Sequence, residues 1–274
     1  MNIIFNLKEL LLYLFIGLVQ GLVEPLPISS SGHMVIFEYI FKITFSDLNF
    51  KIFVNLASFL AITFYYRKFI KEIIKDFFSY IFNKNKRKET KEKFMYVIFV
   101  IIACIPSGIV GILFKDYIEK YLSSILTVAL SLLFTSIILF ILSKLTKNNK
   151  NEEKLNVKKS ISIGLSQIIG LIPGISRSGI TTFMGVNKKL SLEEALKFSF
   201  IMYLPTSIGA TFLSLISDNS IIESFNYLYI VSFISSFIGT YLGISLFFKS
   251  IKKNNFKFFA IYLLIISTII LFII

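Results

Sequence analysis

Residues 17–33 read Gly17-Leu18-Val19-Gln20-Gly21-Leu22-Val23-Glu24-Pro25-Leu26-Pro27-Ile28-Ser29-Ser30-Ser31-Gly32-His33. The apolar run that leads into the Pro- and Ser-rich part, residues 10–23, is short, and a second short run follows at 34–41. Apolar runs of about 10 to 14 residues are typical of re-entrant helices, because a complete membrane crossing takes about 20 residues. We therefore expect a helix that is interrupted inside the membrane.

A second stretch repeats this design 147 residues later in the chain. Residues 164–180 read Gly164-Leu165-Ser166-Gln167-Ile168-Ile169-Gly170-Leu171-Ile172-Pro173-Gly174-Ile175-Ser176-Arg177-Ser178-Gly179-Ile180, and seven of the seventeen aligned positions are identical. Gly, Leu, Ile and Ser are common in membrane helices and raise the number of chance matches. The paired Gln20 and Gln167 and the shared Ser-x-Ser-Gly spacing nevertheless favour an internal duplication, with residues 1–145 and 160–274 as its two repeats.

The rest of the chain has the composition of an all-α membrane protein. It is 55% hydrophobic over 274 residues, with a mean hydropathy of +0.77. Only helices satisfy their own backbone hydrogen bonds in lipid without closing into a barrel. Six segments are long enough to span: 50–66, 94–114, 122–143, 197–217, 226–248 and 256–274. The single cysteine, Cys104, excludes a disulfide framework, and residues 10–23 lack the flanks of a cleaved signal peptide.

Each predicted repeat contains one re-entrant helix pair followed by three spans. Because three is odd, the second repeat must run upside down relative to the first. Inverted repeats of this kind place their sites near the bilayer midplane, between interrupted helices. The fold prediction is therefore one membrane domain with six transmembrane helices and two re-entrant pairs.

The distribution of basic residues predicts the orientation. Four segments expected on one side, 67–93, 144–159, 188–197 and 249–257, carry 23 Lys and Arg residues. The other side has five lysines: Lys8, Lys42, Lys51, Lys115 and Lys120. Lys- and Arg-rich loops stay in the cytoplasm, so both termini and the opening of the site should be extracytoplasmic. Membrane lipids thus explain the net charge of +13 without nucleic acid binding.

The first interruption contains the groups expected of a reactive site. Gln20 and Glu24 are four residues apart and share one helix face. An ionisable residue at membrane depth is costly and indicates a buried partner or a function. His33, the only histidine in the chain, directly follows a serine turn at the start of the next helix. Such a turn directs hydroxyls and backbone N–H groups at one point and can bind an anion.

The second interruption has the same design with an arginine inside it. Arg177 is the only Lys or Arg outside a loop or segment end, and its planar fork of donors suits bidentate phosphate binding. If the two turns meet at one cavity, they combine a carboxylate, an imidazole, hydroxyls and a guanidinium. That set fits phosphoryl transfer, in which catalysis is mostly positioning and stabilisation of oxygen charge.

Structural interpretations compete with the catalytic one. Glu24 and Arg177 could form a buried ion pair without a role in catalysis. The serines of the turns could serve helix packing. Gln20 and Gln167 could tie interrupted helix ends together, an interpretation that we favour over a catalytic role.

These residues resemble the undecaprenyl-diphosphatase family, also called bacitracin-resistance proteins, over essentially the whole chain. The family motif E/Q-G-x-x-E-x-L-P-x-S-S-[S/T]-G-H corresponds to Gln20 through His33, and P-G-x-S-R-S-G-x-T corresponds to Pro173 through Thr181. A weaker similarity is Phe198-Ser199-Phe200 followed by Pro205.

The resemblance implies a hydrolase in the bacterial plasma membrane that converts undecaprenyl diphosphate to the monophosphate. This reaction recycles the lipid carrier of peptidoglycan synthesis and confers bacitracin resistance. The implied catalytic residues are Glu24, Ser30, His33 and Arg177, and the predicted phosphate ligands are Ser29, Ser31, Ser176, Ser178 and Thr181. The implied cofactor is a divalent cation, Mg²⁺ or Ca²⁺, on Glu24 and Gln20.

Some residues depart from the family pattern. Gln20 stands where many members have Glu, which puts a two-carboxylate metal site in doubt. Val23 and Pro25 also depart from the usual residues. Ser30 or His33 could attack phosphorus, or His33 and Glu24 could activate water. A homodimer is an open expectation.

Other function classes fit less well. A lipid-phosphate or small-anion transporter could use the same midplane site, and release of phosphate by detergent-solubilised protein would separate the two. The acid-phosphatase-like lipid phosphatases need a second histidine, which this chain lacks. A purely structural membrane protein would not need Glu24, His33 and Arg177 at interrupted helices.

Overall fold

The computed structural model describes residues 7–42, 48–148, 153–217, 227–251 and 256–274, which form helices and no strand. The α-helices are α1 (Leu7–Val23), α2 (Ser30–Phe41), α3 (Leu48–Tyr65), α4 (Arg67–Phe82), α5 (Arg87–Leu113), α6 (Lys115–Tyr121), α7 (Ile125–Asn148), α8 (Val157–Ile169), α9 (Arg177–Asn187), α10 (Leu192–Ser217), α12 (Leu228–Ile251) and α13 (Phe256–Ile273). A short 3₁₀ turn, η1 (Lys84–Lys86), joins α4 to α5.

Within the described residues, five helices are long and apolar enough to cross a membrane: α5, α7, α10, α12 and α13. They correspond to five of the six predicted spans. The sixth prediction, 50–66, coincides with α3, which is apolar but shorter over Phe50–Tyr65. The chain is thus a multi-pass membrane protein whose described segments are helical.

The lysine-rich segment 67–93 was predicted as a loop, but it contains helix α4, which packs on the first turns of α5. Phe77 of α4 stacks on Phe94 of α5, with ring centroids 5.2 Å apart. Lys93 lies 3.2 Å from Glu72 and 3.0 Å from Asp76. Apolar residues at helical spacing on α4 explain why this charged segment folds as a hairpin.

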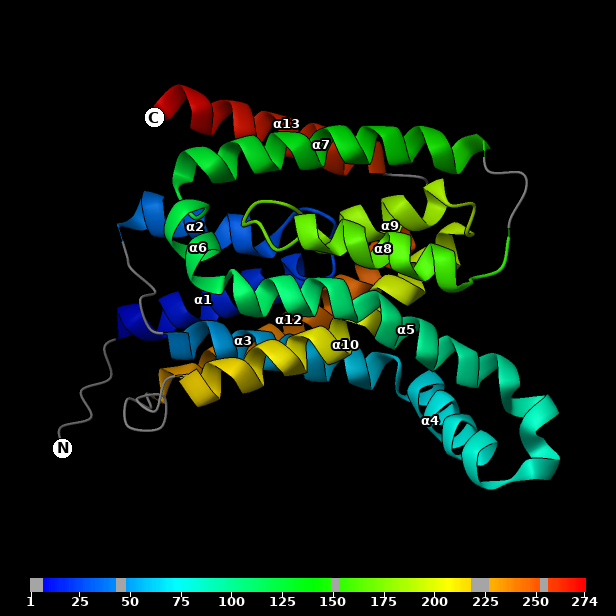
Figure 1. The fold of residues 1–274 in the computed structure, drawn as a ribbon. Helices are drawn as coiled ribbons and strands as arrows, with labels where there is room; N and C mark the ends of the chain where they lie inside the picture. Colours follow the sequence, from blue (N-terminus) through cyan, green and yellow to red (C-terminus); the bar gives the residue numbers. More distant parts are fainter. Residues whose placement is uncertain (1–6, 43–47, 149–152, 218–226, 252–255) are drawn as a thin grey trace.

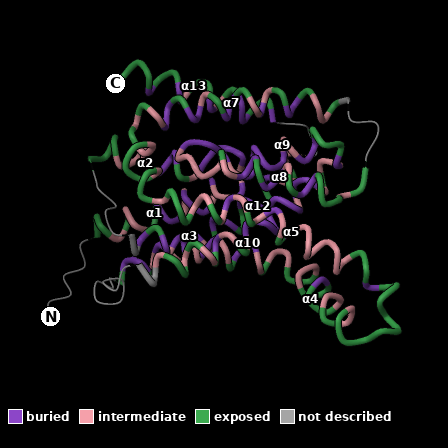
Figure 2. Tube along the Cα trace, viewed as in Figure 1, coloured by how far each residue is buried: buried purple, intermediate pink, exposed green. Residues whose placement is uncertain are grey.

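The short apolar runs form two helix pairs that start from opposite ends of the bundle. In Figure 1, α1 runs inward from the end where α13 finishes, and α2 runs back to that same end. The α8–α9 pair does the same from the end that carries α4. Both interruptions lie in the middle of the bundle, where Figure 2 shows mostly buried backbone.

Close backbone contacts hold α1 and α8 in place. A Cβ added at Gly21 would lie 2.2 Å from the carbonyl oxygen of Ser236, so α1 lies directly against α12. A Cβ added at Gly164 would lie 2.3 Å from the carbonyl oxygen of Ala103, so α8 lies directly against α5. Small residues allow such close packing between membrane helices. Each short helix is therefore packed against a long helix of the other predicted repeat.

Candidate active site

The two serine turns are built alike. Ser29 caps α2 by accepting a hydrogen bond from the Gly32 backbone N–H, and Ser176 caps α9 by accepting one from Gly179. The N–O distances are 3.2 and 3.1 Å. Ser and Asn caps of this type satisfy one of the free N–H groups at a helix start. The remaining N–H groups and the helix dipole make each turn attractive to an anion.

Helix α7 supports the second turn. Gly174 has a φ of +93°, which residues with a side chain rarely adopt, and a Cβ there would lie 2.6 Å from Ser131 Cβ. Thr135 Oγ1 donates to the carbonyl of Gly174 at 3.2 Å and accepts from the Ser176 N–H at 3.2 Å. The Pro-Gly sequence therefore allows a tight reversal that one threonine holds in place.

The two turns touch each other. A Cβ at Gly32 would lie 2.9 Å from the Cα of Gly174, so this contact needs a glycine at position 32. The structure thus brings together the two interruptions that the sequence pattern had aligned.

Glu24 lies at the centre of the contact. Its Oε1 accepts a hydrogen bond from Arg177 at 3.1 Å, and its Oε2 accepts from Ser30 Oγ at 2.6 Å and from Gln20 Nε2 at 3.1 Å. The Glu24 side chain is 7% exposed and that of Arg177 is 25% exposed. Three donors compensate the buried carboxylate, and its hydrogen bonds are of the strong, charge-assisted kind.

Arg177 also contacts an aromatic ring that the motifs had not indicated. Its guanidinium carbon lies 4.0 Å from the centroid of the Tyr203 ring, a cation–π contact. The Tyr203 hydroxyl donates to the backbone carbonyl of Asn55 at 3.3 Å. The ring therefore joins α10 to α3 and gives the guanidinium a fixed face to rest on. The only sequence signal for Tyr203 is its place just after Phe198-Ser199-Phe200.

His33 is buried on α2, three residues after Ser30. Its Nδ1 lies 2.8 Å from the carbonyl oxygen of Ser29, and its Nε2 lies 2.8 Å from the hydroxyl of Tyr262 on α13. The His33 and Tyr262 rings are parallel within 4°. Residues three apart share one helix face, so Ser30 and His33 point to the same side of α2. No sequence motif had indicated Tyr262.

The remaining predicted residues divide into two groups. Ser31 Oγ and Ser178 Oγ each lie 3.3 Å from the capping serine of their own turn, beside the helix starts. Thr181 instead donates to the Arg177 carbonyl at 2.8 Å and pairs with Ser199 at 2.7 Å. Gln167 donates to Ser107 Oγ at 2.9 Å. It ties the end of α8 to the interior of α5 and not to another interrupted helix end.

The residues at the site fit a cation that takes most of its ligands from substrate and water. No cluster of three or more His, Cys, Asp or Glu side chains occurs among the described residues. Glu24 is the carboxylate of the site, and the Oε1 atom of Gln20 is buried without a hydrogen-bond partner. Mg²⁺ commonly uses one or two carboxylates together with substrate phosphates and water, which suits such a sparse donor set.

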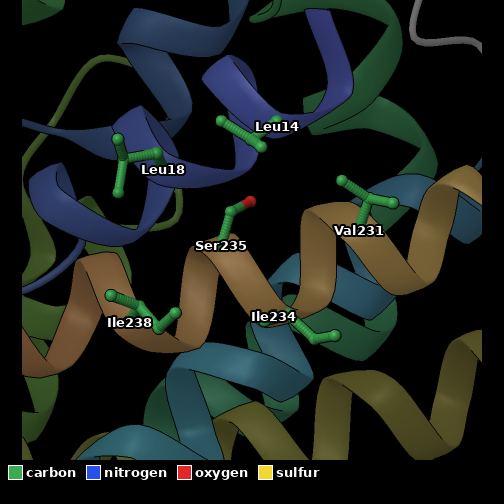
Figure 3. Close-up of a pocket in the computed structure, with 6 residues that line it drawn as sticks. All are labelled: Leu14, Leu18, Val231, Ile234, Ser235 and Ile238. Carbon is green, nitrogen blue, oxygen red and sulfur yellow. The ribbon is translucent and has the colours of Figure 1, made fainter. Parts of the chain in front are cut away.

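An open apolar groove with a volume of about 320 Å³ lies between α1 and α12. Figure 3 shows the residues that line it: Leu14, Leu18, Val231, Ile234, Ser235 and Ile238. It shares no lining residue with the polar site. Leu18 lies two positions before Gln20, so α1 connects the two regions.

Comparison with known proteins gives one consistent family. The family model of the bacitracin resistance protein BacA matches residues 13–269. A protein of Bacillus thuringiensis named undecaprenyl-diphosphatase 2 is 40% identical over 262 residues, covering 95% of this chain and 96% of the relative. The undecaprenyl-diphosphatase of Oceanobacillus iheyensis is 38% identical over 276 residues and covers 99% of both chains. Undecaprenyl-diphosphatase 1 of Shouchella clausii is 37% identical over 266 residues, covering 96% of this chain and 95% of the relative.

Proposed function

The chain belongs to the family of the bacitracin resistance protein BacA, and we propose that it hydrolyses undecaprenyl diphosphate to undecaprenyl phosphate and inorganic phosphate within the membrane. One observation carries the proposal at the level of residues: the Glu24 carboxylate joins Arg177 of one turn to Ser30 of the other. This junction supports the proposal that Glu24 acts as general base, Ser30 as nucleophile and Arg177 as phosphate-binding group between two helix starts.

We propose that the fold is an inverted repeat of six spans and two re-entrant pairs, with repeats at 1–145 and 160–274. The matching caps at Ser29 and Ser176 support this arrangement. So does the equivalent packing of α1 on α12 and of α8 on α5. The lysine-rich end would be cytoplasmic, and the termini and the site would open to the outer face of the bacterial plasma membrane.

The proposed reaction has two displacements on the terminal phosphorus. In the first, Ser30 Oγ attacks this phosphorus while its proton passes to Glu24 Oε2, and the bond to the bridging oxygen breaks to release undecaprenyl phosphate. In the second, water attacks the phosphoserine, gives a proton to His33, and releases inorganic phosphate while Ser30 regains its proton from Glu24. Throughout, Arg177 and the N–H groups of the two turns stabilise the charge on the non-bridging oxygens.

We propose that Mg²⁺ or Ca²⁺, held by Glu24 and the Oε1 atom of Gln20, would neutralise part of the diphosphate charge. Chelation should then lower phosphate release, and added cation should restore it. Activity that is unaffected by complete chelation would contradict this part of the proposal.

The direct test uses purified, detergent-solubilised protein with undecaprenyl diphosphate and measures free phosphate. The wild type should release phosphate, and Arg177→Ala should release almost none while keeping its elution profile. Lys188→Ala is the matched control, because it removes a positive charge from the exposed far end of α9 and should retain full activity. A transporter would release no phosphate in detergent, because it performs no bond cleavage.

A further inference from the structure

The orientation of the His33 ring is set by two contacts on opposite ring nitrogens. Nδ1 faces the Ser29 carbonyl oxygen at 2.8 Å, and Nε2 faces the Tyr262 hydroxyl at 2.8 Å. A carbonyl oxygen can only accept a hydrogen bond. Nδ1 must therefore carry the proton, and in the neutral ring Nε2 is left with the lone pair.

This assignment determines which atom of His33 can react. A neutral imidazole accepts a proton or attacks phosphorus through its unprotonated nitrogen, and the partner of the other nitrogen selects the tautomer. With Nδ1–H committed to Ser29, the reactive atom is Nε2. In the structure that atom accepts a hydrogen bond from Tyr262.

We infer that Tyr262 is a positioning residue for His33, which acts in the reaction through Nε2. The inference rests on the proposed function. The Tyr262 hydroxyl can donate only to a nitrogen without a proton, so it reinforces the tautomer that Ser29 selects. Its ring lies parallel to that of His33 within 4°, with the ring centroids 5.7 Å apart. When the water of the second displacement approaches, it replaces the tyrosine hydroxyl at Nε2.

Helix α13 is well placed for this role. It packs along α7, where Ser136 Oγ donates to the carbonyl of Ala260 at 2.7 Å, two residues before Tyr262. Helix α7 also carries Thr135, which holds the turn that contains Ser176. The same helix therefore fixes the position of the second turn and of the tyrosine that restrains the histidine.

Because His33 is the only histidine in the chain, its tautomer can be measured directly. Protein labelled with ¹⁵N-histidine and purified on a histidine-free affinity tag gives NMR signals from His33 alone. The wild type should show a protonated Nδ1 and an unprotonated, hydrogen-bonded Nε2. A wild type with the proton on Nε2 would overturn the inference without any variant.

Tyr262→Phe keeps the ring and removes the hydroxyl. We expect the Nε2 signal to shift, the pH profile of kcat to change, and kcat to fall about 10-fold with little change in KM, as for the loss of one hydrogen bond. Tyr241→Phe is the matched control, because Tyr241 lies exposed on α12 and its ring contacts are with Phe64 and Tyr65. It should leave all four readouts unchanged.

The outcomes distinguish the role of Tyr262 from the phosphatase activity. An unchanged Nε2 signal, or a changed signal with an unchanged kcat and pH profile, overturns the role of Tyr262 and leaves the phosphatase proposal intact. A wild type that releases no phosphate overturns the phosphatase proposal and this role with it. A shift of the signal together with the loss of kcat supports the inference.

Discussion

Glu24→Gln is the most informative substitution because it removes one charge and almost no volume. In the structure the carboxylate accepts hydrogen bonds from Arg177, Ser30 and Gln20. An amide keeps one acceptor oxygen but directs N–H groups at donors. We therefore expect a loss of both stability and activity, and the two losses should differ in origin.

The stability loss can be bounded from the geometry. Removing one partner of a buried ion pair typically costs about 3 to 5 kcal/mol. Because the Arg177 side chain is 25% exposed and can be partly solvated, we expect about 2 to 4 kcal/mol. That corresponds to a fall in Tm of about 5 °C for a protein of this size.

The activity loss should be much larger. A positioned general base contributes about 10²- to 10⁴-fold to the rate, so kcat should fall by about 10³-fold. The assay pairs phosphate release with thermal unfolding in the same detergent. Glu38→Gln is the matched control, because it makes the same change at a carboxylate on α2. Glu38 pairs with Lys51 at 3.6 Å, but this pair is partly exposed and should contribute less than about 1 kcal/mol to stability.

The double variant Glu24→Leu with Arg177→Met distinguishes catalysis from a structural ion pair. Replacing both charges by apolar groups can restore stability. If the pair were only structural, phosphate release would return together with the Tm. Recovery of near-wild-type kcat in this double variant would refute the catalytic assignment of both residues.

Three further predictions follow from individual contacts. Ser30→Ala should lower kcat by at least about 10²-fold. Rapid denaturation of the wild-type enzyme during turnover should leave labelled phosphate on Ser30. Full activity of the Ser30→Ala variant would exclude the covalent route. Tyr203→Ala should raise KM several-fold by removing about 1 kcal/mol of cation–π stabilisation from Arg177. Tyr203→Phe keeps the ring and should leave KM unchanged. Equal KM values for the two variants would contradict a role of the ring in holding Arg177. Gly21→Ala should lower the yield of folded protein, because its Cβ would lie 2.2 Å from the Ser236 carbonyl oxygen. Gly108→Ala is the control, because a Cβ there has no atom within 4 Å. Similar Tm values for the two variants would show that the α1–α12 contact can rearrange to accept a methyl group.

Much of the fold and part of the site could be predicted from the sequence, for identifiable reasons. Short apolar runs around Pro, Gly and Ser indicate interrupted helices, and an ionisable residue at each interruption needs a partner in lipid. That reasoning predicted the meeting of Glu24 and Arg177. It missed α4, where abundant lysines hid the spacing of Ile73 and Phe77 on one helix face.

Tyr203 and Tyr262 could not be identified in the same way. Each lies in an ordinary apolar helix. Tyr203 follows Phe198-Ser199-Phe200, but nothing in the residues beside Tyr262 separates it from the other tyrosines. Their roles come from the packing of α10 and α13 against the turns. Such packing depends on contacts between segments far apart in the sequence, which a local pattern does not encode.

The ion pair between Glu24 and Arg177 also has a consequence for biogenesis. The two residues are 153 positions apart, and α12, against which α1 packs, is synthesised later still. Until residue 177 is synthesised, the Glu24 carboxylate has only its donors within the hairpin, Gln20 and Ser30, and lacks its positively charged partner, which is costly in hydrocarbon. A chain that ends before Arg177 should consequently hold its N-terminal hairpin less stably in the membrane than the complete chain does.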